Sequence, residues 1–590
     1  MNQTIRRRPI LFGSAVACGA ALAFGVGALA PDGTTRSTLA ASPTPRQVTG
    51  GTVKKMAPRN GRRVIERKAA TPSSASPRRR AVGPSHRLAV SVLDRAGRAP
   101  GDADAQSFEV FDLATGEELD GVFTGGSGQI EVPAGTYRVG AWIRTPEPGH
   151  PNAKALMIRP SVRITGDTEL VLDARTTRRV EVSLDIADPK LFLGDAVVPM
   201  TTEGQRHSYD LPLEDGLFVS PAAGVSLHVF TTWTRDGAGR GPYRYSVLTT
   251  SKGRIPDNPT FRVRTADLAD VRTGYPAPGD TSCLVISDGP DLPDLSFVVS
   301  HDVTAGATPV AQTVHATPGV LWRSSHRIGG ADCASGRPEV TEVTEGAERF
   351  PSARDYTRRW LTAPLTPGPS FWNARDLSPA VVRHQDLLDV NMSLFSDGVP
   401  GHVGPRSAPW EDGHITGRTT LMQDGRQLGT SPYAGYGSFT LPRESSHYRL
   451  ETHAERKVPW SPLSTRTDAV WTFTSAHTDG TAVPALMTVR YDAGLDDHSR
   501  APAGSAHRIE ARIQTPPGVE AAEVEQLRVR VSYDDGKTWH DTSVQAGDDG
   551  WTIDLHHPAH AEYVSLRAIA ADTRGNTVTQ TTIRAYALRR

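Results

Sequence analysis

Residues 527–539 read L-R-V-R-V-S-Y-D-D-G-K-T-W and decide the fold class of the chain. Leu527, Val529 and Val531 alternate with charged or polar neighbours. A period of two places successive side chains on opposite faces, which predicts a half-buried antiparallel strand. The pair Asp535-Gly536 follows and predicts a hairpin turn, because glycine tolerates the positive φ that such turns need.

The same pattern of short alternating strands and Gly- or Pro-containing turns continues from about residue 86 to the end of the chain. Such regular spacing indicates an all-β protein built of tandem β-sandwiches after a disordered N-terminal linker. Only two stretches, Thr265–Val271 and Pro379–Leu388, could each form a short helix. The segment V-P-A-G-T-Y-R-V at 132–139 is typical of small transthyretin-like or carboxypeptidase-regulatory-like sandwiches.

A chain of 590 residues is several domains long, because single cores seldom grow beyond roughly 250 residues. We expect a signal peptide at 1–30 and a disordered basic Pro/Ser/Thr/Arg-rich linker at 31–85. The domains expected after them are a carboxypeptidase-regulatory-like β-sandwich at 86–185, a β-sandwich at 186–272, a β-rich domain with a disulfide at 273–375, a β-sandwich at 376–483 and an Ig- or fibronectin III-like β-sandwich at 484–590.

The formal net charge is zero but unevenly distributed. Residues 1–30 carry three Arg and no acid, and residues 31–85 carry twelve Lys or Arg against two acids, a net of +10. The rest of the chain therefore sums to 0 − 3 − 10 = −13. The linker has almost no apolar periodicity and cannot offset the entropy of ordering. It is either a solvated spacer or a segment that holds an anionic polymer of the cell envelope.

The N-terminus predicts export. Arg6-Arg7-Arg8 precede an apolar run, Ile10–Ala30, that ends in the small-x-small pattern Ala28-Leu29-Ala30, as in secretory signals. Cleavage after Ala28 or near Ala40, an uncleaved membrane span and a twin-Arg signal are the alternatives. We expect a secreted protein with no transmembrane span in its mature form and Cys18 removed.

Two cysteines then stay in the mature chain, Cys283 and Cys333. In an oxidising compartment such a pair predicts a disulfide. The alternative is two free thiols, although no companion motif around either cysteine suggests catalysis.

Residues Ser532, Asp534, Gly536 and Trp539 fit the pattern S-x-D-x-G-x-T-W. This is the Asp-box hairpin that is repeated in sialidase propellers, where it stabilises a turn and is not catalytic. A single copy cannot build a propeller, which needs several blades. We interpret these residues as a hairpin.

Two clusters have the residue types of metal ligands. His556, His557 and His560 offer three imidazoles at short spacing, and Asp288, Asp291 and Asp294 offer oxygens to calcium. Pro558 indicates a bend within the first cluster, and Pro290 and Pro293 indicate a plain acidic loop in the second. We expect no metal and no cofactor.

The tripeptide Gly429-Thr430-Ser431 resembles the nucleophile motif of subtilisin-like proteases. A serine nucleophile needs a histidine base and usually an orienting acid. The chain contains no H-G-T-H and no D-T-G or D-S-G. We therefore interpret Ser431 as a turn residue and expect no catalytic residue.

Larger pieces of the chain resemble the region after the catalytic domain in large secreted subtilisin-like (S8 family) serine peptidases of GC-rich bacteria. The resemblance covers roughly 500 residues and rests on H-R-L-A-V-S-V-L-D-R-A-G-R-A-P, V-P-A-G-T-Y-R-V, L-G-T-S-P-Y-A-G-Y-G-S-F-T-L-P and L-R-V-R-V-S-Y-D-D-G-K-T-W. It implies β-sandwiches that contact a substrate or a surface. The α/β catalytic domain of the family is missing, so the resemblance carries over no catalytic residue.

These observations predict a secreted, non-catalytic accessory or binding protein. The alternatives are a hydrolase of the serine peptidase family, and a cell-wall or glycan-binding adhesin. Trp360, Trp372 and Trp410 could stack on sugar rings in an adhesin, although packing explains such residues more often. The expected partner is an extracellular protein or a cell-envelope polymer, with no nucleic acid, and the expected state is a monomer.

Overall fold

The computed structural model describes residues 62–66, 84–200, 208–280, 282–295, 297–330, 333, 341–373, 376–409, 411 and 413–590. Regular structure in them consists of β-strands and two single-turn 3-10 helices, Ala174–Thr176 (η1) and Thr265–Asp267 (η2). The prediction of an all-β chain of successive sandwiches is confirmed. The predicted signal peptide lies outside the described residues, and within them no helix is long and apolar enough to span a membrane.

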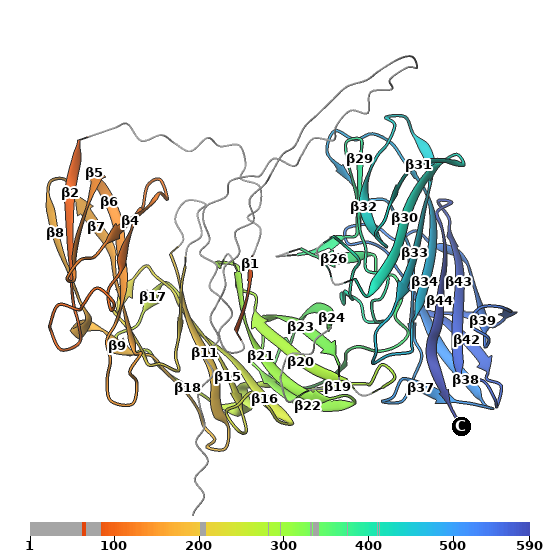
Figure 1. Cartoon of the computed structure of the whole chain (residues 1–590), viewed down its shortest axis with the longest axis horizontal. Coiled ribbons are helices and arrows are strands. Elements are labelled where there is room, and N and C mark those ends of the chain that lie inside the picture. Colours follow the sequence, from red (N-terminus) through yellow and green to blue (C-terminus); the bar gives the residue numbers. More distant parts are fainter. Residues whose placement is uncertain are drawn as a thin grey trace, which may run out of the picture. The chain divides into compact units, whose positions relative to one another are not determined.

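Two sheets enclose the first hydrophobic core. A three-stranded sheet has the order β5-β2-β8, with β2 at Ser85–Leu93, β5 at Ser127–Pro133 and β8 at Thr168–Asp173. A six-stranded sheet has the order β4-β3-β6-β7-β13-β9, with β3 at Ser107–Asp112, β4 at Glu118–Val122, β6 at Gly135–Arg144, β7 at Lys154–Ile164, β9 at Arg178–Arg179 and β13 at Leu217–Val219 (Figure 1). Alternating apolar residues of both sheets meet in this core, among them Leu88, Val90, Val139 and Ala141.

Strand β7 separates the first core from a second one. Ala155 and Met157 belong to the first core, whereas Leu156 and Ile158 belong to the second. The period-two geometry of a strand explains this division, because successive side chains point to opposite faces. Strands buried on both faces are apolar in nearly continuous runs, as in Ala155–Ile158.

The middle of the chain forms a seven-stranded sheet of order β12-β11-β15-β16-β22-β19-β25. Its strands are β11 Lys190–Pro199, β12 Ser208–Pro212, β15 Leu227–Thr234, β16 Tyr243–Ser251, β19 Ala269–Tyr275, β22 Val310–Ala316 and β25 Asp355–Arg359. Two short ladders flank it, made by β10 Glu181–Leu184 with β18 Thr260–Val263, and by β14 Ala222–Ala223 with β17 Arg254–Ile255.

A five-stranded sheet of order β1-β21-β20-β23-β24 follows, with β20 at Cys283–Pro290, β21 at Phe297–Ala307, β23 at Leu321–Gly329 and β24 at Thr341–Arg349. Its edge strand β1, Arg62–Glu66, comes from the predicted linker and pairs antiparallel with β21. These five residues of the predicted linker thus form a strand at the edge of this sheet. The β-branched pair Val64-Ile65 favours a strand, and the edge of β21 offers backbone partners.

Buried polar side chains join the five-stranded and seven-stranded sheets. Arg244 of β16 forms an ion pair with Asp288 of β20, and both are buried. His301 Nε2 of β21 lies 2.6 Å from Asp195 Oδ2 of β11, and each side chain is 1% exposed. Buried charges need such partners, so each pair helps to set how these two sheets face each other.

Three sheets and a short hairpin make up the rest of the chain. A four-stranded sheet has the order β32-β29-β28-β35, a nine-stranded sheet contains the path β31-β30-β33-β34-β44-β43-β39-β40 with β37 beside β44, and another four-stranded sheet has the order β36-β38-β42-β41 (Figure 1). The strands are β26 Ser370–Trp372, β27 Leu377–Pro379, β28 Val381–His384, β29 Leu387–Asn391, β30 Ile415–Gln423, β31 Arg426–Ser431, β32 Tyr436–Thr440, β33 Ser446–Arg456, β34 Arg466–Ser475, β35 Thr481–Ala482, β36 Thr488–Asp492, β37 Arg500–Pro502, β38 Ala506–Gln514, β39 Val524–Ser532, β40 His540–Asp541, β41 Ser543–Gly547, β42 Gly550–His556, β43 Tyr563–Asp572 and β44 Thr577–Arg589. One hydrophobic cluster reaches all three sheets and includes Val390, Trp471, Ile509 and Tyr586.

The predictions of a short helix at Thr265–Val271 and at Pro379–Leu388 are both wrong. Only Thr265–Asp267 of the first stretch is helical, as a single 3-10 turn, and β19 begins at Ala269. The second stretch is the β28–β29 hairpin, whose turn contains Gln385 at φ 53°. Its apolar residues Val381 and Leu388 are buried, so packing overrides a weak helical pattern.

The predicted domain boundaries stay predictions, since the described residues belong to one compact unit. Hydrogen-bonded ladders cross all four boundaries predicted between the β-domains. β7 pairs with β13 across 185/186, β16 with β22 across 272/273, β26 with β27 across 375/376 and β34 with β44 across 483/484. Neighbouring stretches of sequence thus share sheets.

A disulfide joins Cys283, the first residue of β20, to Cys333. Their Cα atoms lie 5.1 Å apart, within the range that a bridge requires. Cys283 is fully buried in the strand. The bond therefore ties the segment after β23 to the middle of the five-stranded sheet.

Replacing both cysteines with serine should lower the free energy of unfolding by about 2–4 kcal/mol, because the bridge closes a loop that restricts the unfolded chain. The two residues are 50 positions apart in the sequence. Chemical denaturation with and without reductant measures the effect. Reductant should destabilise the wild type and leave the double variant unchanged; equal sensitivity of both proteins would contradict the prediction.

Candidate functional site

The Asp-box-like residues lie in the turn between β39 and β40. The Ser532 hydroxyl accepts a hydrogen bond from the Gly536 N–H at 2.9 Å and donates one to Asp534 at 2.7 Å. Asp534 accepts the N–H and the hydroxyl of Thr538 at 2.9 and 2.6 Å. These hydrogen bonds hold the pKa of Asp534 well below its usual value. The indole N–H of Trp539 donates to the Gly536 carbonyl, so the motif residues serve the turn.

The three histidines near residue 557 do not converge. His557 is buried, with its two ring nitrogens 3.1 Å from the Tyr533 hydroxyl and 3.3 Å from the Tyr586 hydroxyl, whereas His556 and His560 are exposed. In the described part of the chain, no group of three His, Cys, Asp or Glu side chains is arranged to hold a metal ion.

Acid should destabilise the fold through His557. Burial, together with the nearby His507 and His556, lowers its pKa from 6.5 to about 4. The unfolded chain therefore takes up the proton first, and the free energy of unfolding should fall as pH drops from about 6.5 towards 4. The loss should be on the order of 2 kcal/mol. Thermal melts across this pH range measure it.

The His557→Gln variant should be less sensitive to pH over that range than the wild type. The exposed His560→Gln variant is the matched control and should keep the wild-type profile, because His560 does not contribute to the lowered pKa of His557. Identical profiles for the His557 variant and the wild type would contradict a role for this side chain.

The three aspartates near residue 290 also serve separate contacts. Asp288 pairs with Arg244, and Asp294 Oδ2 lies 2.8 Å from His228 Nε2. Asp291 Oδ2 lies 3.6 Å from Arg323 Nη1. Their oxygens thus pair with cationic or imidazole side chains instead of pointing to a common centre.

Ser431 ends β31, and its hydroxyl accepts the backbone N–H of Tyr433 at 3.3 Å, as a turn residue would. Of the three tryptophans considered for sugar stacking, Trp360 is fully buried, with His402 stacked 3.6 Å from its ring centre. Trp360 is therefore a packing residue and has no face open to a sugar ring. Trp372 is half-buried and donates to the Gly401 carbonyl, while Trp410 lies outside the described residues.

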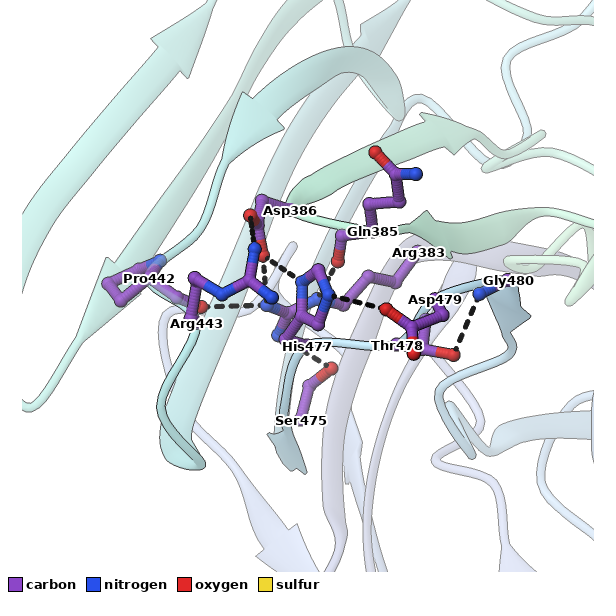
Figure 2. Close-up of polar contacts among 10 residues, drawn as sticks. All are labelled: Arg383, Gln385, Asp386, Pro442, Arg443, Ser475, His477, Thr478, Asp479 and Gly480. Atoms are coloured by element: carbon purple, nitrogen blue, oxygen red, sulfur yellow. Dashed lines mark hydrogen bonds and ion pairs between the residues drawn. The ribbon is translucent and has the colours of Figure 1, made fainter.

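A polar network surrounds the β28–β29 turn (Figure 2). Arg383 is fully buried and all three nitrogens of its guanidinium donate: Nε to the Gln385 carbonyl at 2.7 Å, Nη1 to Ser475 Oγ at 3.2 Å and Nη2 to the Pro442 carbonyl at 2.7 Å. The arginine thus clamps the hairpin to the ends of neighbouring strands.

His477 in the same network lies between two carboxylates. Its Nδ1 is 2.6 Å from Asp386 Oδ1 and its Nε2 is 3.3 Å from Asp479 Oδ1 (Figure 2). The hydrogen bond from His477 lowers the pKa of Asp386. Carboxylates contact both ring nitrogens of His477, so this network stabilises the β28–β29 turn.

A pocket of about 500 Å³ lies among the described residues. The face of the β36–β38 ladder lines one side of it, and Thr362 and the segment Gly398–Pro400 line another. Arg490 stands opposite Arg512 in the ladder, and Asp492 stands opposite Glu510. Because these positions alternate with the core residues of both strands, the four side chains share one face.

Arg490 is the buried charge of this pocket, at 3% exposure. Its Nη1 donates to the Thr366 carbonyl and hydroxyl at 3.0 and 3.1 Å and to the Pro367 carbonyl at 2.6 Å. Its Nε and Nη2 have no hydrogen-bond partner among the described residues. Arg383 is also buried, but all three nitrogens of its guanidinium donate hydrogen bonds to acceptors of the chain.

The electrostatic environment of Arg490 is set by burial and by Asp397. Burial lowers the pKa of Arg490 to about 10, and the charge of Asp397 opposes that shift. Burial raises the pKa of Asp397, but its ion pair with His402, Nδ1 to Oδ1 at 2.9 Å, and the charge of Arg490 leave it lowered. Arg490 therefore stays charged at neutral pH.

Sequence reasoning missed this site. Arg490 stands in the run A-L-M-T-V-R-Y-D, 485–492, where alternation predicts a solvent-facing side chain. The segments that cover it, near Thr362 and Thr366 and at Gly398–Pro400, lie at least 90 positions earlier in the sequence. An arginine between the apolar residues Val489 and Tyr491 is the one local signal.

Comparisons with known proteins identify no family. No family model and no curated protein matches the chain. Among solved structures, the Bacillus anthracis TIE protein is similar at 10% identity over 47% of this chain and 50% of that one, with a TM-score of 0.12. A streptococcal ancillary pilin is similar at 10% identity over 47% of this chain and 99% of that one, with a TM-score of 0.11. An Escherichia coli alpha-2-macroglobulin activated by porcine elastase has 9% identity, coverages of 86% and 53%, and a TM-score of 0.12.

The chain thus spans about half the length of the first of these structures. TM-scores of 0.11–0.12 describe no common global arrangement. The function is accordingly argued from the site.

Proposed function

We propose that the protein is a secreted, non-catalytic binding protein of the extracellular space. Its ligand is an extracellular protein or a polymer of the cell envelope. The disulfide supports this location, because structural disulfides persist in oxidising compartments. An accessory role beside secreted subtilisin-like peptidases belongs to the proposal on the strength of the sequence resemblance.

The observation that carries the proposal is the pocket with Arg490 in it. A concave site with a few polar groups is the usual form of a ligand site. Charged side chains of both signs line this pocket, among them Arg359, Arg512, Asp492 and Glu510, and can pair with polar groups of a ligand. The tandem sandwiches provide a rigid support, because the pocket wall is a β-ladder.

Saturable binding tests the proposal. The mature chain is sedimented with isolated bacterial cell envelope and, in a second assay, titrated against fractionated secreted proteins. We expect saturable binding in one of the two assays, weakened at least tenfold by Thr362→Trp, which fills the pocket. The Trp142→Ala variant, which changes a tryptophan of β6 outside the pocket, is the control.

An active-serine probe and casein test the peptidase alternative on the same preparation. We expect neither labelling nor cleavage. Labelling that disappears in Ser431→Ala would establish the hydrolase instead, and the absence of saturable binding in both assays would refute the binding function.

A further inference from the structure

We propose that Trp360 and the segment 397–403 form a latch over His326, which opens in mild acid and thereby changes the wall of the pocket. The latch is closed in the structure, where His326 is shielded from water, and it is open when His326 is hydrated and protonated. The regulation rests on the proposed binding function, because it acts on the same pocket. The opening of the latch itself can be measured without any ligand.

Three buried rings make the contact between the latch and the five-stranded sheet. His326 of β23 and Trp360 are fully buried, and His402 is 4% exposed. The ring centres of His326 and Trp360 lie 3.9 Å apart, and those of Trp360 and His402 lie 3.6 Å apart. Gly346 of β24 makes room for these rings, since a Cβ atom there would lie 2.5 Å from the Trp360 ring. Water can therefore reach His326 when Trp360 is displaced.

Polar atoms inside the closed latch lack hydrogen bonds. Nδ1 and Nε2 of His326, Nε1 of Trp360 and Nε2 of His402 are buried and have no hydrogen-bond partner among the described residues. Each of these groups gains hydrogen bonds to water when the latch opens. The backbone adds strain, because Leu361 has a φ of 61°, in the left-handed region that bulky residues rarely adopt. Both features lower the free energy that is needed to open the latch.

Hydrogen bonds join the two parts of the latch to each other and to the sheet. The Leu361 N–H donates to Asp397 Oδ2 at 2.9 Å, and Asp397 Oδ1 lies 2.9 Å from His402 Nδ1. The backbones of Val403 and Glu345 exchange two hydrogen bonds of 2.8 Å, which attach the segment to β24. Because Asp397 contacts both parts, the latch opens as one unit.

The surroundings of His326 oppose a positive charge on its ring. Titratable groups from several elements surround it, namely Asp288 of β20, Arg358 of β25, Arg244 of β16, Tyr275 of β19 and His402 of the latch. Burial lowers the pKa of His326 well below 6.5, the arginines and His402 lower it further, and Asp288 raises it. Asp288 already pairs with Arg244, and Arg358 pairs with Glu348. His326 therefore stays neutral in the closed latch at pH 7.

Protonation of His326 is coupled to the opening of the latch. In the open latch water surrounds the imidazole, whose pKa is then about 6.5. Because opening takes up a proton, the opening equilibrium rises as pH falls below about 6.5, by up to about tenfold per pH unit. Between pH 7.5 and pH 5.5 the expected increase is about tenfold.

Both parts of the latch border the pocket. Arg359, Thr362 and Ala363, which flank Trp360 in the sequence, line the pocket together with Gly398–Pro400 of the segment. Opening therefore displaces two stretches of the pocket wall, and a ligand that fits the closed pocket loses contacts. Because only the closed chain binds fully, affinity can fall by up to about tenfold between pH 7.5 and pH 5.5.

Hydrogen–deuterium exchange of the full mature chain at pH 7.5 and pH 5.5, read by mass spectrometry, tests the opening. Exchange times are scaled for the intrinsic pH dependence of amide exchange. We expect the protection factors of residues 358–363 and 397–403 to fall about tenfold in acid, while those of β2 and β8 in the first core stay constant. Constant protection of the latch would overturn the inference, as would an equal fall in β2 and β8.

His326→Phe keeps an aromatic ring against Trp360 but takes up no proton. Its latch should have the same protection at both pH values. His540→Gln, at an exposed position of β40, is the matched control and should lose protection as the wild type does. A folded His326→Phe variant that still loses tenfold in acid would refute the role of His326. The exchange measurement on the wild type decides the matter even if this variant does not fold.

The two binding assays, repeated at pH 5.5, test the link to the pocket. Saturable binding should weaken in the wild type, by up to about tenfold, and stay unchanged in His326→Phe. Equal binding of the wild type at both pH values would overturn the regulation. If the latch opens in acid but neither assay shows binding at pH 7.5, the proposed function fails and the opening stands. If binding is found and the latch stays closed in acid, the function stands and this inference fails.

Discussion

Replacing Arg456 with methionine should lower the free energy of unfolding by about 3–5 kcal/mol, because it leaves a buried carboxylate without its cation. Arg456 Nε and Nη2 lie 2.6 and 2.5 Å from the two oxygens of Glu342, and the side chains are 1% and 4% exposed. Burial raises the pKa of Glu342, but the charges and hydrogen bonds of Arg456 and His414 together outweigh it and hold the value at about 2. The pair joins β24 to β33.

Urea denaturation followed by tryptophan fluorescence measures this loss. Removing both charges in Arg456→Met with Glu342→Gln should restore part of it, because no unpaired charge is then left inside. Arg426→Met, at an exposed position of β31, should change stability by no more than about 0.5 kcal/mol. A single Arg456 variant as stable as the Arg426 control would contradict the prediction.

Replacing Trp471 with alanine should cost about 3–5 kcal/mol, because it opens a cavity in the largest core. Trp471 is fully buried in β34 and belongs to the cluster shared by the last three sheets. Its indole N–H donates to the Met487 carbonyl at 2.7 Å. The variant therefore loses apolar contacts and leaves a buried carbonyl without its donor.

Trp142→Ala is the matched control, since this tryptophan of β6 is 36% exposed and contacts the Lys154 ammonium at 5.2 Å. It should cost less than about 1 kcal/mol. Thermal and urea unfolding of both variants measure the difference. Similar losses for the two variants would show that the core at Trp471 relaxes around the gap.

The sequence by itself determined the local features. Alternation along Leu527, Val529 and Val531 predicted strand β39, whose buried face consists of those residues. The expectation that Cys283 and Cys333 are the two cysteines outside a signal peptide predicted the pair that the structure joins. Both arguments depend on local features, namely the period of a strand and the small number of cysteines.

Local patterns were insufficient where distant segments meet. Pro379–Leu388 has a weak helical pattern, yet its partners in the sheet make it a hairpin. The ladder between β34 and β44 joins residues about 110 positions apart. Strand pairing of this kind is chosen by the whole set of edges that the chain offers, and a single segment does not contain that information.

Only the tertiary structure decided the environment of the polar and aromatic side chains. Trp360 is buried against His402, and Arg490 is covered by segments that precede it by at least 90 residues. The sequence states which groups can donate and accept, but the free energy of each group depends on whether water or protein surrounds it. Burial and hydrogen-bond satisfaction arise from packing across the fold. They distinguish Arg383, whose three guanidinium nitrogens all donate to the chain, from Arg490, of whose guanidinium only Nη1 has acceptors among the described residues.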